Sequence, residues 1–151
     1  IMKQYVDMNQ AYRLYINALT HLNIDDHNYI MTNDYRLIRR IARDQKTRGR
    51  SAEEIISFRE SVAEGEYQYI YPYQEESDCI MNTSLMYELA ILKKEVESSL
   101  LAVKKDSIAA YDACRLLKIL SYVSAGDASC IPRSSVLQEF LVNSIFEETT
   151  F

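Results

Sequence analysis

Residues 34–51 of the chain, DYRLIRRIARDQKTRGRS, contain the pattern on which the fold prediction rests. Apolar side chains recur within it at helical spacing, which predicts an amphipathic helix over about 34–47. Gly49 is typical of the residue that ends a helix, and Ser51 with Glu54 has the spacing of a capping box. The segment therefore predicts one helix, a stop at a glycine and the immediate start of a second helix. The apolar stripe of the first helix is Leu37, Ile38 and Ile41.

The same segment holds a basic island in an acidic protein. Seven Lys and Arg residues between 36 and 50 stand against one acid, Asp44, in a chain whose net charge is −5. Arg36, Arg40 and Arg43 fall at i, i+4 and i+7, so they share a helix face that differs from the apolar one. Guanidinium groups bind phosphate oxygens bidentately, and this face therefore predicts a local anion site. The alternative is a solvated helix face whose arginines pair with acids elsewhere in the chain.

The composition excludes several classes of protein. An acidic chain is not typical of a general nucleic-acid binder. The Walker pattern GxxxxGK[ST] is absent, and the 3 Cys have no CxxC spacing that would indicate a zinc site. No run approaches the about 18 apolar residues of a membrane span, and no signal peptide opens the chain. We expect one domain in a reducing, cytoplasmic setting, and the start at Ile1 favours a piece of a longer protein.

The flanking segments predict short strands and several helices. Residues 12–19 alternate apolar and polar side chains and indicate a strand, and the apolar run 79–81 indicates another. The alternating tyrosines of 67–73 favour an edge strand, because Pro72 keeps the segment out of a central position. The expected fold class is mostly α with a few short strands, in a single region 1–151. Helices are expected over about 52–65, 85–103, 107–123 and 136–146.

The pattern D-x-R-L-x-R-R-x-x-R-D followed by R-G-R, between Asp34 and Arg50, resembles the lid segment of uridine kinases and their nucleoside-kinase relatives. Every fixed position of that pattern is present. The likeness to the bacterial-type subgroup of this uridine kinase and phosphoribulokinase superfamily extends over about residues 12–142. By this resemblance the chain is the C-terminal, lid-bearing part of a P-loop nucleoside kinase. The similar segments are 12–33, 61–82, 84–101 and the terminal IPRSSVLQEF.

The resemblance implies an α/β P-loop kinase fold for the parent protein, with a lid at about 34–51 and a C-terminal helical part at about 84–147. It implies an ATP-dependent nucleoside kinase that uses ATP and Mg²⁺, with a nucleoside and ATP as partners and neither nucleic acid nor membrane. The chain would pack against a P-loop half, and a homo-oligomer is left open. By position, Arg43 and Arg48 are expected at the ATP phosphates, Arg40 and Arg50 on the nucleoside and acceptor side, and Asp34, Arg36 and Gly49 in positioning the lid.

Departures from the family pattern limit what these residues can do. The P-loop, its lysine and hydroxyl, and the early catalytic carboxylate have no counterpart here, so we expect no catalytic residue, no metal ligand and no phosphoryl transfer by this chain alone. The subgroup tends to have basic residues at the positions of Tyr29 and Ala63-Glu64, which favours a shifted substrate or lost activity if those groups touch phosphate. The alternative function is a non-catalytic anion-binding or helical assembly module descended from such a kinase.

Overall fold

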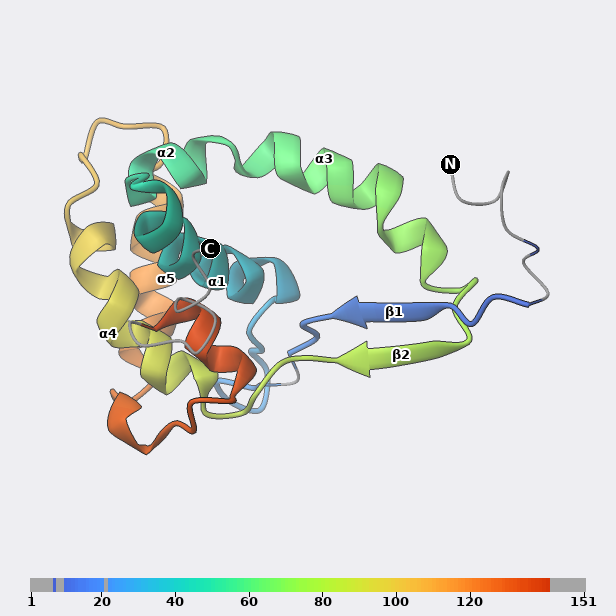
Figure 1. Cartoon of the computed structure of the whole chain (residues 1–151). Helices are drawn as coiled ribbons and strands as arrows, with labels where there is room; N and C mark the ends of the chain where they lie inside the picture. Colours follow the sequence, from blue (N-terminus) through green and yellow to red (C-terminus); the bar gives the residue numbers. More distant parts are fainter. Residues whose placement is uncertain (1–6, 8–9, 21, 142–151) are drawn as a thin grey trace, which may run out of the picture.

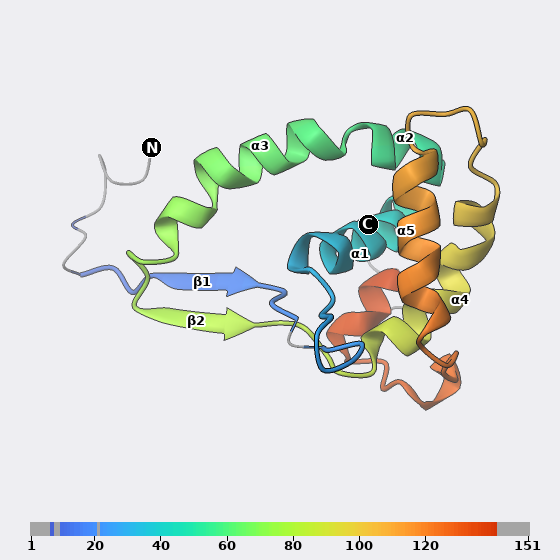
Figure 2. The ribbon, with the colours of Figure 1, turned by 180° about the vertical axis from the view of Figure 1, so that it is seen from behind.

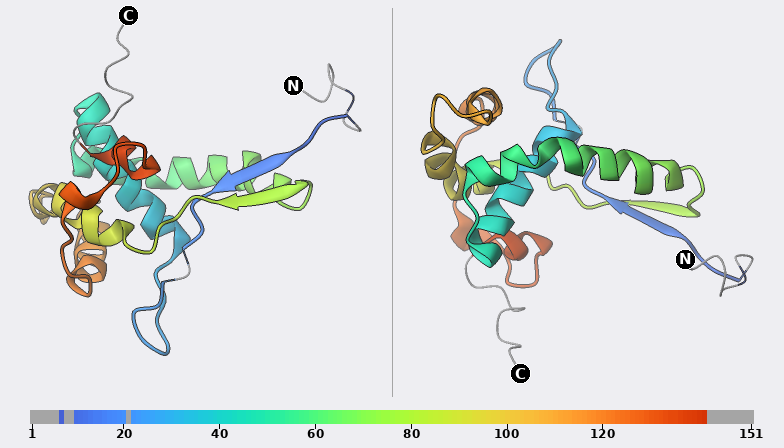
Figure 3. Two further views of the ribbon diagram at one scale, coloured as in Figure 1. Left: turned by 60° about the horizontal axis from the view of Figure 1, so that its bottom comes forward. Right: turned by 90° about the horizontal axis from the view of Figure 1, so that it is seen from above.

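The computed structural model describes residues 7, 10–20 and 22–141. A helical body carries a two-stranded sheet that extends away from it (Figures 1 and 3). The prediction of a mostly helical chain with short strands is confirmed, and the arrangement is consistent with part of an α/β kinase fold. The elements are β1 (Leu14–Asn17), α1 (Thr32–Arg48), α2 (Ala52–Ser57), α3 (Arg59–Tyr69), η2 (Tyr71–Tyr73), β2 (Cys79–Asn82), α4 (Glu88–Leu101), α5 (Ala110–Ser121), η3 (Ala128–Cys130) and η4 (Val136–Phe140).

The two strands confirm the predictions for 12–19 and 79–81 and are parallel. Leu14 lies opposite Cys79, and the register continues to the pair Asn17 and Asn82. Parallel strands need a long crossover connection, and here α1, α2 and α3 supply it (Figure 2). The connection returns along α3, which extends beside the sheet, so the end of β1 faces both α1 and α3.

The helix α1 is the centre of the core, as its apolar stripe predicts. Its last turn ends at Gly49, which has a φ of 62° and whose N–H donates to the carbonyls of Asp44 and Gln45. The capping box is also confirmed, because the Ser51 hydroxyl accepts from the Glu54 N–H and the Glu54 carboxylate accepts from the Ser51 N–H. Buried side chains of four helices pack together; they include Ile38, Ile41, Ile55, Leu89, Leu92 and Leu116.

The predicted edge strand at 67–73 is wrong, and so is the helix end near Gly65. The helix that starts after Ser51 breaks at Phe58, and α3 then continues through Gly65 to Tyr69 before the 3₁₀ turn η2. A tertiary contact stabilises α3, because its residue Glu66 is buried and pairs with Arg36 of α1 at 2.7 Å. A long-range ion pair of this kind overrides the strand preference of a tyrosine-rich segment.

The C-terminal helices are shorter than predicted. Residues 85–87 and 107–109 form turns, so α4 and α5 begin three residues after their expected starts. The helix expected over 136–146 is the 3₁₀ segment η4 as far as Phe140, and residues 142–146 lie outside the described part. Within the described residues, no helix is long and apolar enough to cross a membrane.

Candidate functional site

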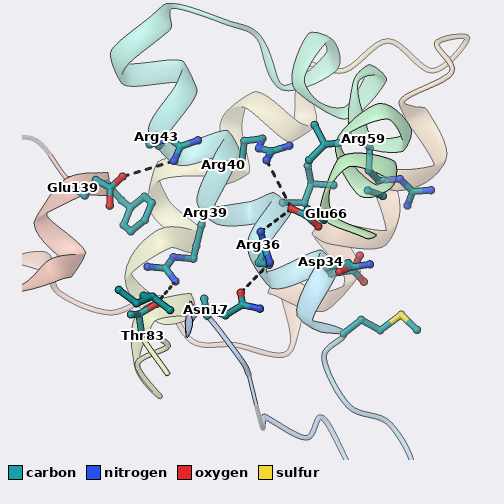
Figure 4. A pocket seen from close by; sticks show the side chains of 18 of the residues that line it. Asn17, Asp34, Arg36, Arg39, Arg40, Arg43, Arg59, Glu66, Thr83 and Glu139 are labelled. Atoms are coloured by element: carbon teal, nitrogen blue, oxygen red, sulfur yellow. Dashed lines mark hydrogen bonds and ion pairs between the residues drawn. The ribbon is translucent and has the colours of Figure 1, made fainter. Parts of the chain in front are cut away.

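A pocket of about 580 Å³ lies between α1, α3, the end of β1 and η4 (Figure 4). Its lining is unusually rich in charge. Six arginines line it, four of them from one face of α1, against four carboxylates contributed by α1, α3 and η4. The pocket is therefore positive overall and suited to an anion. The arginines are Arg36, Arg39, Arg40, Arg43, Arg59 and Arg115, and the acids are Asp34, Glu60, Glu66 and Glu139.

Two arginines of α1 lie at different distances from the carboxylate of Glu66. Its Oε1 lies 2.7 Å from Arg36 Nη2 but 4.0 Å from Arg40 Nη2, and Arg36 also donates to the Asn17 side chain at 2.9 Å. Arg36 is thus held on both sides. Arg40 donates no side-chain hydrogen bond to any described residue, and burial lowers its pKa more than Glu66 raises it. The donors of the Arg40 guanidinium are therefore not used by any described side chain.

Arg39 is held against the core by a buried carboxylate. Its Nε lies 2.9 Å from Oε1 of Glu88, which is fully buried. The guanidinium lies 4.9 Å from the ring centre of Phe140 and 5.8 Å from that of Tyr35. Tyr35 donates to Glu88 Oε2 at 2.5 Å. Burial raises the pKa of Glu88, although the Tyr35 hydrogen bond and the Arg39 charge oppose that rise.

Two further arginines of α1, Arg43 and Arg48, pair with Asp44. Arg43 Nε donates to Asp44 at 3.0 Å, and Arg48 Nη1 donates to its other oxygen at 2.9 Å. Burial alone would raise the pKa of Asp44, but these two arginines outweigh it and hold that pKa below its ordinary value. Arg43 lines the pocket, whereas Arg48 does not; Arg50 also lies outside, with its guanidinium 5.9 Å from the Phe58 ring centre.

Asp34 anchors the start of α1 to α5. Its carboxylate pairs with Arg115, which also lies 2.6 Å from Asp112, and Arg59 donates to that same Asp112 oxygen at 2.8 Å. Burial would lower the pKa of Arg115, but the two carboxylates raise it above its ordinary value. This network lies at the Asp34 end of α1, and each of its two arginines pairs with at least one acid.

The sequence pattern placed Asp34, Arg36, Arg40 and Arg43 among the site residues, and all four line the pocket. It did not single out the arginines of α3 and α5 or the acids of α3 and η4, because none of them lies in the arginine-rich pattern of residues 34–51. Tyr29 is 64% exposed and is not a lining residue, whereas Ala63 is one. The described residues contain no cluster of His, Cys, Asp and Glu that could hold a metal ion.

The model of the phosphoribulokinase / uridine kinase family matches residues 1–89, which is more than half of the chain. The chain belongs to this family. No curated protein and no solved structure matches it. The expectation of a uridine kinase-like superfamily member is thereby confirmed.

Membership of the phosphoribulokinase / uridine kinase family relates the chain to kinases, which are phosphotransferases with a P-loop. The matched segment contains both strands and the four pocket arginines of α1. The pocket also has a wall outside that segment, because Arg115, Glu139 and Phe140 follow residue 89. Helix α5 and the 3₁₀ segment η4 therefore contribute to the pocket.

Proposed function

We propose that this chain is the C-terminal, lid-bearing part of an ATP-dependent nucleoside kinase. In this proposal the pocket binds phosphoryl groups, a nucleoside is the acceptor, and ATP with its accompanying Mg²⁺ is the donor. The observation that carries the proposal is Arg40, whose partly buried guanidinium lines the pocket and donates no hydrogen bond to a described side chain. A partly desolvated cation with free donors is well suited to a phosphate oxygen.

The chemistry of phosphoryl transfer fits such a site. Charge spreads over the three equatorial oxygens of the transferred group, so catalysis depends on fixed cations more than on covalent chemistry. Arg40 and Arg43 lie one helical turn apart and line the same pocket. Arg36 and Arg39 are held by acids and would supply fixed positive charge.

Arg48 and Arg50 flank Gly49 at the end of α1, and we propose that this turn closes over the bound phosphates. Arg48 has a side chain that is 55% exposed, and buried Asp44 would keep its hydrogen bond from Arg43 when Arg48 turns towards a ligand. Gly49 is already left-handed, and a glycine can change its backbone angles without a side-chain clash. Asp34 would keep the other end of α1 fixed during this movement through its pair with Arg115.

These residues contain no P-loop, and the described part has no cluster for a metal ion, so transfer by the proposed enzyme needs a P-loop segment in addition to them. Mg²⁺ would neutralise phosphate charge when bound with ATP, whereas this chain would bind and orient the phosphates through its arginines. The 151 residues alone are expected to bind polyphosphate without transferring it.

Titration calorimetry with inorganic tripolyphosphate and with ATP tests the binding part of the proposal. We expect Arg40→Ala to weaken the affinity of the full chain by about tenfold or more, because a charge-assisted bidentate contact is lost. The control is Lys105→Ala, which removes an equal charge from the turn between α4 and α5, away from the pocket. Equal effects of the two substitutions would refute Arg40 as a phosphate ligand.

A kinase assay on the protein with its P-loop segment tests the catalytic part. Arg43→Ala is expected to lower kcat/KM for nucleoside phosphorylation by on the order of 10²-fold. An unchanged kcat/KM would refute the role of Arg43 in transfer. Tight phosphate binding without turnover in that protein would replace the kinase proposal with the non-catalytic anion-binding module.

A further inference from the structure

The segment η4 forms a wall of the pocket outside the part matched by the family model, and it is firmly attached. Leu137 is fully buried in the core, and the Ser135 side chain accepts from the Leu137 N–H. The Gln138 amide donates to the carbonyls of Ile131 and Pro132 at 3.1 and 3.2 Å. Lys46 of α1 donates to the carbonyl of Leu141. The side chains of η4 that reach the pocket therefore start from a fixed backbone.

Two adjacent side chains of η4 contact the arginine face of α1. The Phe140 ring lies 4.9 Å from the guanidinium of Arg39, and the Glu139 carboxylate lies 3.8 Å from Nη1 of Arg43 (Figure 4). Both η4 residues line the pocket. A ligand anion bound to Arg43 would therefore meet the negative charge of Glu139 at close range.

The contact between Glu139 and Arg43 has little value for folding. At 3.8 Å it is too long for a hydrogen bond, and the Glu139 side chain is 49% exposed. Asp44, the other carboxylate beside Arg43, is buried and hydrogen-bonded at 3.0 Å. The charge of Glu139 nevertheless acts inside the molecule: burial raises the pKa of Glu88, and Glu139 adds to that rise.

We propose that Glu139 is a built-in competitor for phosphate, an internal carboxylate that occupies Arg43 and limits how strongly the pocket binds highly charged ligands. This inference rests on the proposed function, since it requires phosphate at Arg43. Coulomb repulsion scales with the ligand charge, so the effect is larger for a polyphosphate than for a monophosphate. Glu139 is thus a specificity-determining residue that is supplied by the C-terminal segment.

The test compares Glu139→Gln with a matched control, Glu97→Gln. Glu97 of α4 pairs with Lys93 at 3.9 Å, its side chain is 44% exposed, and it does not line the pocket. Calorimetry on the full chain would use inorganic tripolyphosphate and orthophosphate. We expect Glu139→Gln to tighten tripolyphosphate binding by about fivefold and orthophosphate binding by about twofold relative to the control. Glu139→Asp, which keeps the charge, should stay within about twofold of the wild type.

Arg40→Ala, measured in the same series, separates the two proposals. If the wild type binds tripolyphosphate and Arg40→Ala weakens it, but Glu139→Gln equals Glu97→Gln or weakens binding, only the role of Glu139 is overturned. If the wild type does not bind tripolyphosphate, or if Arg40→Ala has no effect, the proposed function fails and the role of Glu139 fails with it. If Glu139→Gln alone increases the affinity, and the increase is larger for tripolyphosphate than for orthophosphate, both the proposed function and the role of Glu139 are supported.

Discussion

Replacement of Tyr35 by Phe removes a single oxygen atom from the most deeply buried polar contact of α1. Tyr35 and Glu88 are both fully buried, and the hydroxyl donates to Glu88 Oε2 at 2.5 Å. It also accepts from the Leu85 N–H at 3.4 Å. Phe keeps the ring and its packing, so the substitution leaves the core volume nearly unchanged and reports on the hydrogen bond to the carboxylate.

The expected loss follows from the charge of Glu88. A hydrogen bond to a charged group contributes about 1.5–3 kcal/mol, so Tyr35→Phe should lower the free energy of unfolding by about 2 kcal/mol near neutral pH. For a chain of this length, that corresponds to a fall in Tm of about 4–8 °C. Arg39 should also become less well fixed, because its partner Glu88 loses the second group that orients it.

The loss should depend on pH. Burial raises the pKa of Glu88 above its ordinary 4.5, whereas the Tyr35 hydroxyl favours the ionised form and opposes that rise. In the wild type, a raised pKa means that the contribution of Glu88 to stability is largest below pH 4.5 and declines as the pH rises through the raised value. Without the hydroxyl the pKa rises further and the decline continues to higher pH, so the deficit of Tyr35→Phe is larger at pH 8 than at pH 5.

Urea unfolding followed by circular dichroism at pH 5 and pH 8 measures both effects. The control is Tyr111→Phe, since Tyr111 is 77% exposed and the same atom is removed there from a solvated side chain. Three results would refute this role of the buried carboxylate. The first is a loss of unfolding free energy below about 0.5 kcal/mol, and the second is a loss equal to that of the control. The third is a difference from the wild type that becomes smaller towards pH 8.

Four further substitutions test the local structure by the same unfolding assay. Ser51→Ala removes the capping box of α2 and should lower the free energy of unfolding by about 1 kcal/mol, without altering phosphate affinity. Gly49→Ala should lower it by about 1–2 kcal/mol, because the φ of 62° is unfavourable for a residue with a Cβ even though no neighbour lies within 4 Å of it. Leu92→Ala should lower it by about 2–5 kcal/mol through a core cavity, and a loss below 1 kcal/mol would contradict the packing described. Asp44→Asn should lower the free energy of unfolding at pH 7, because ionised Asp44 stabilises the fold, as its depressed pKa indicates. The difference from the wild type should narrow as the pH falls below the ordinary pKa of 3.8 and the Asp44 carboxylate becomes protonated.

The parts of the fold that depend on local patterns could be predicted from the sequence. The apolar spacing of α1, the glycine at its end and the capping box after it depend on residues at most five positions apart. The alternation in β1 and the short apolar run of β2 are equally local. Their parallel pairing is not local, because Leu14 and Cys79 meet only after a crossover of three helices.

The tyrosine-rich segment shows where local patterns fail. Tyr67 and Tyr69 alternate as in a strand, yet they are 77% and 66% exposed on a helix. The deciding contacts are those of Glu66 with Arg36 and with the Tyr71 hydroxyl at 3.2 Å. Arg36 is 30 positions from Glu66, and no periodicity within the segment contains that information.

The positive charge of the pocket could be predicted from the sequence, but the ion-pair partners of each arginine could not. Arg39 and Arg40 are adjacent and chemically identical, yet Arg39 pairs with buried Glu88 at 2.9 Å, whereas the ion pair of Arg40 with Glu66 in the described part of the chain measures 4.0 Å. A helix rotates adjacent residues by about 100°, so the two side chains point to different neighbours, and partners from distant helices decide which cation is available.

In the proposed function, the acids of the pocket matter as much as its arginines. Six guanidinium groups around one pocket would repel one another, and the carboxylates of Glu66 and Glu139 reduce that repulsion while no ligand is bound. A phosphate that binds at Arg43 replaces part of the interaction with Glu139, so one anion is exchanged for another. In this proposal, ligand affinity depends partly on residues that lie beyond the matched family segment.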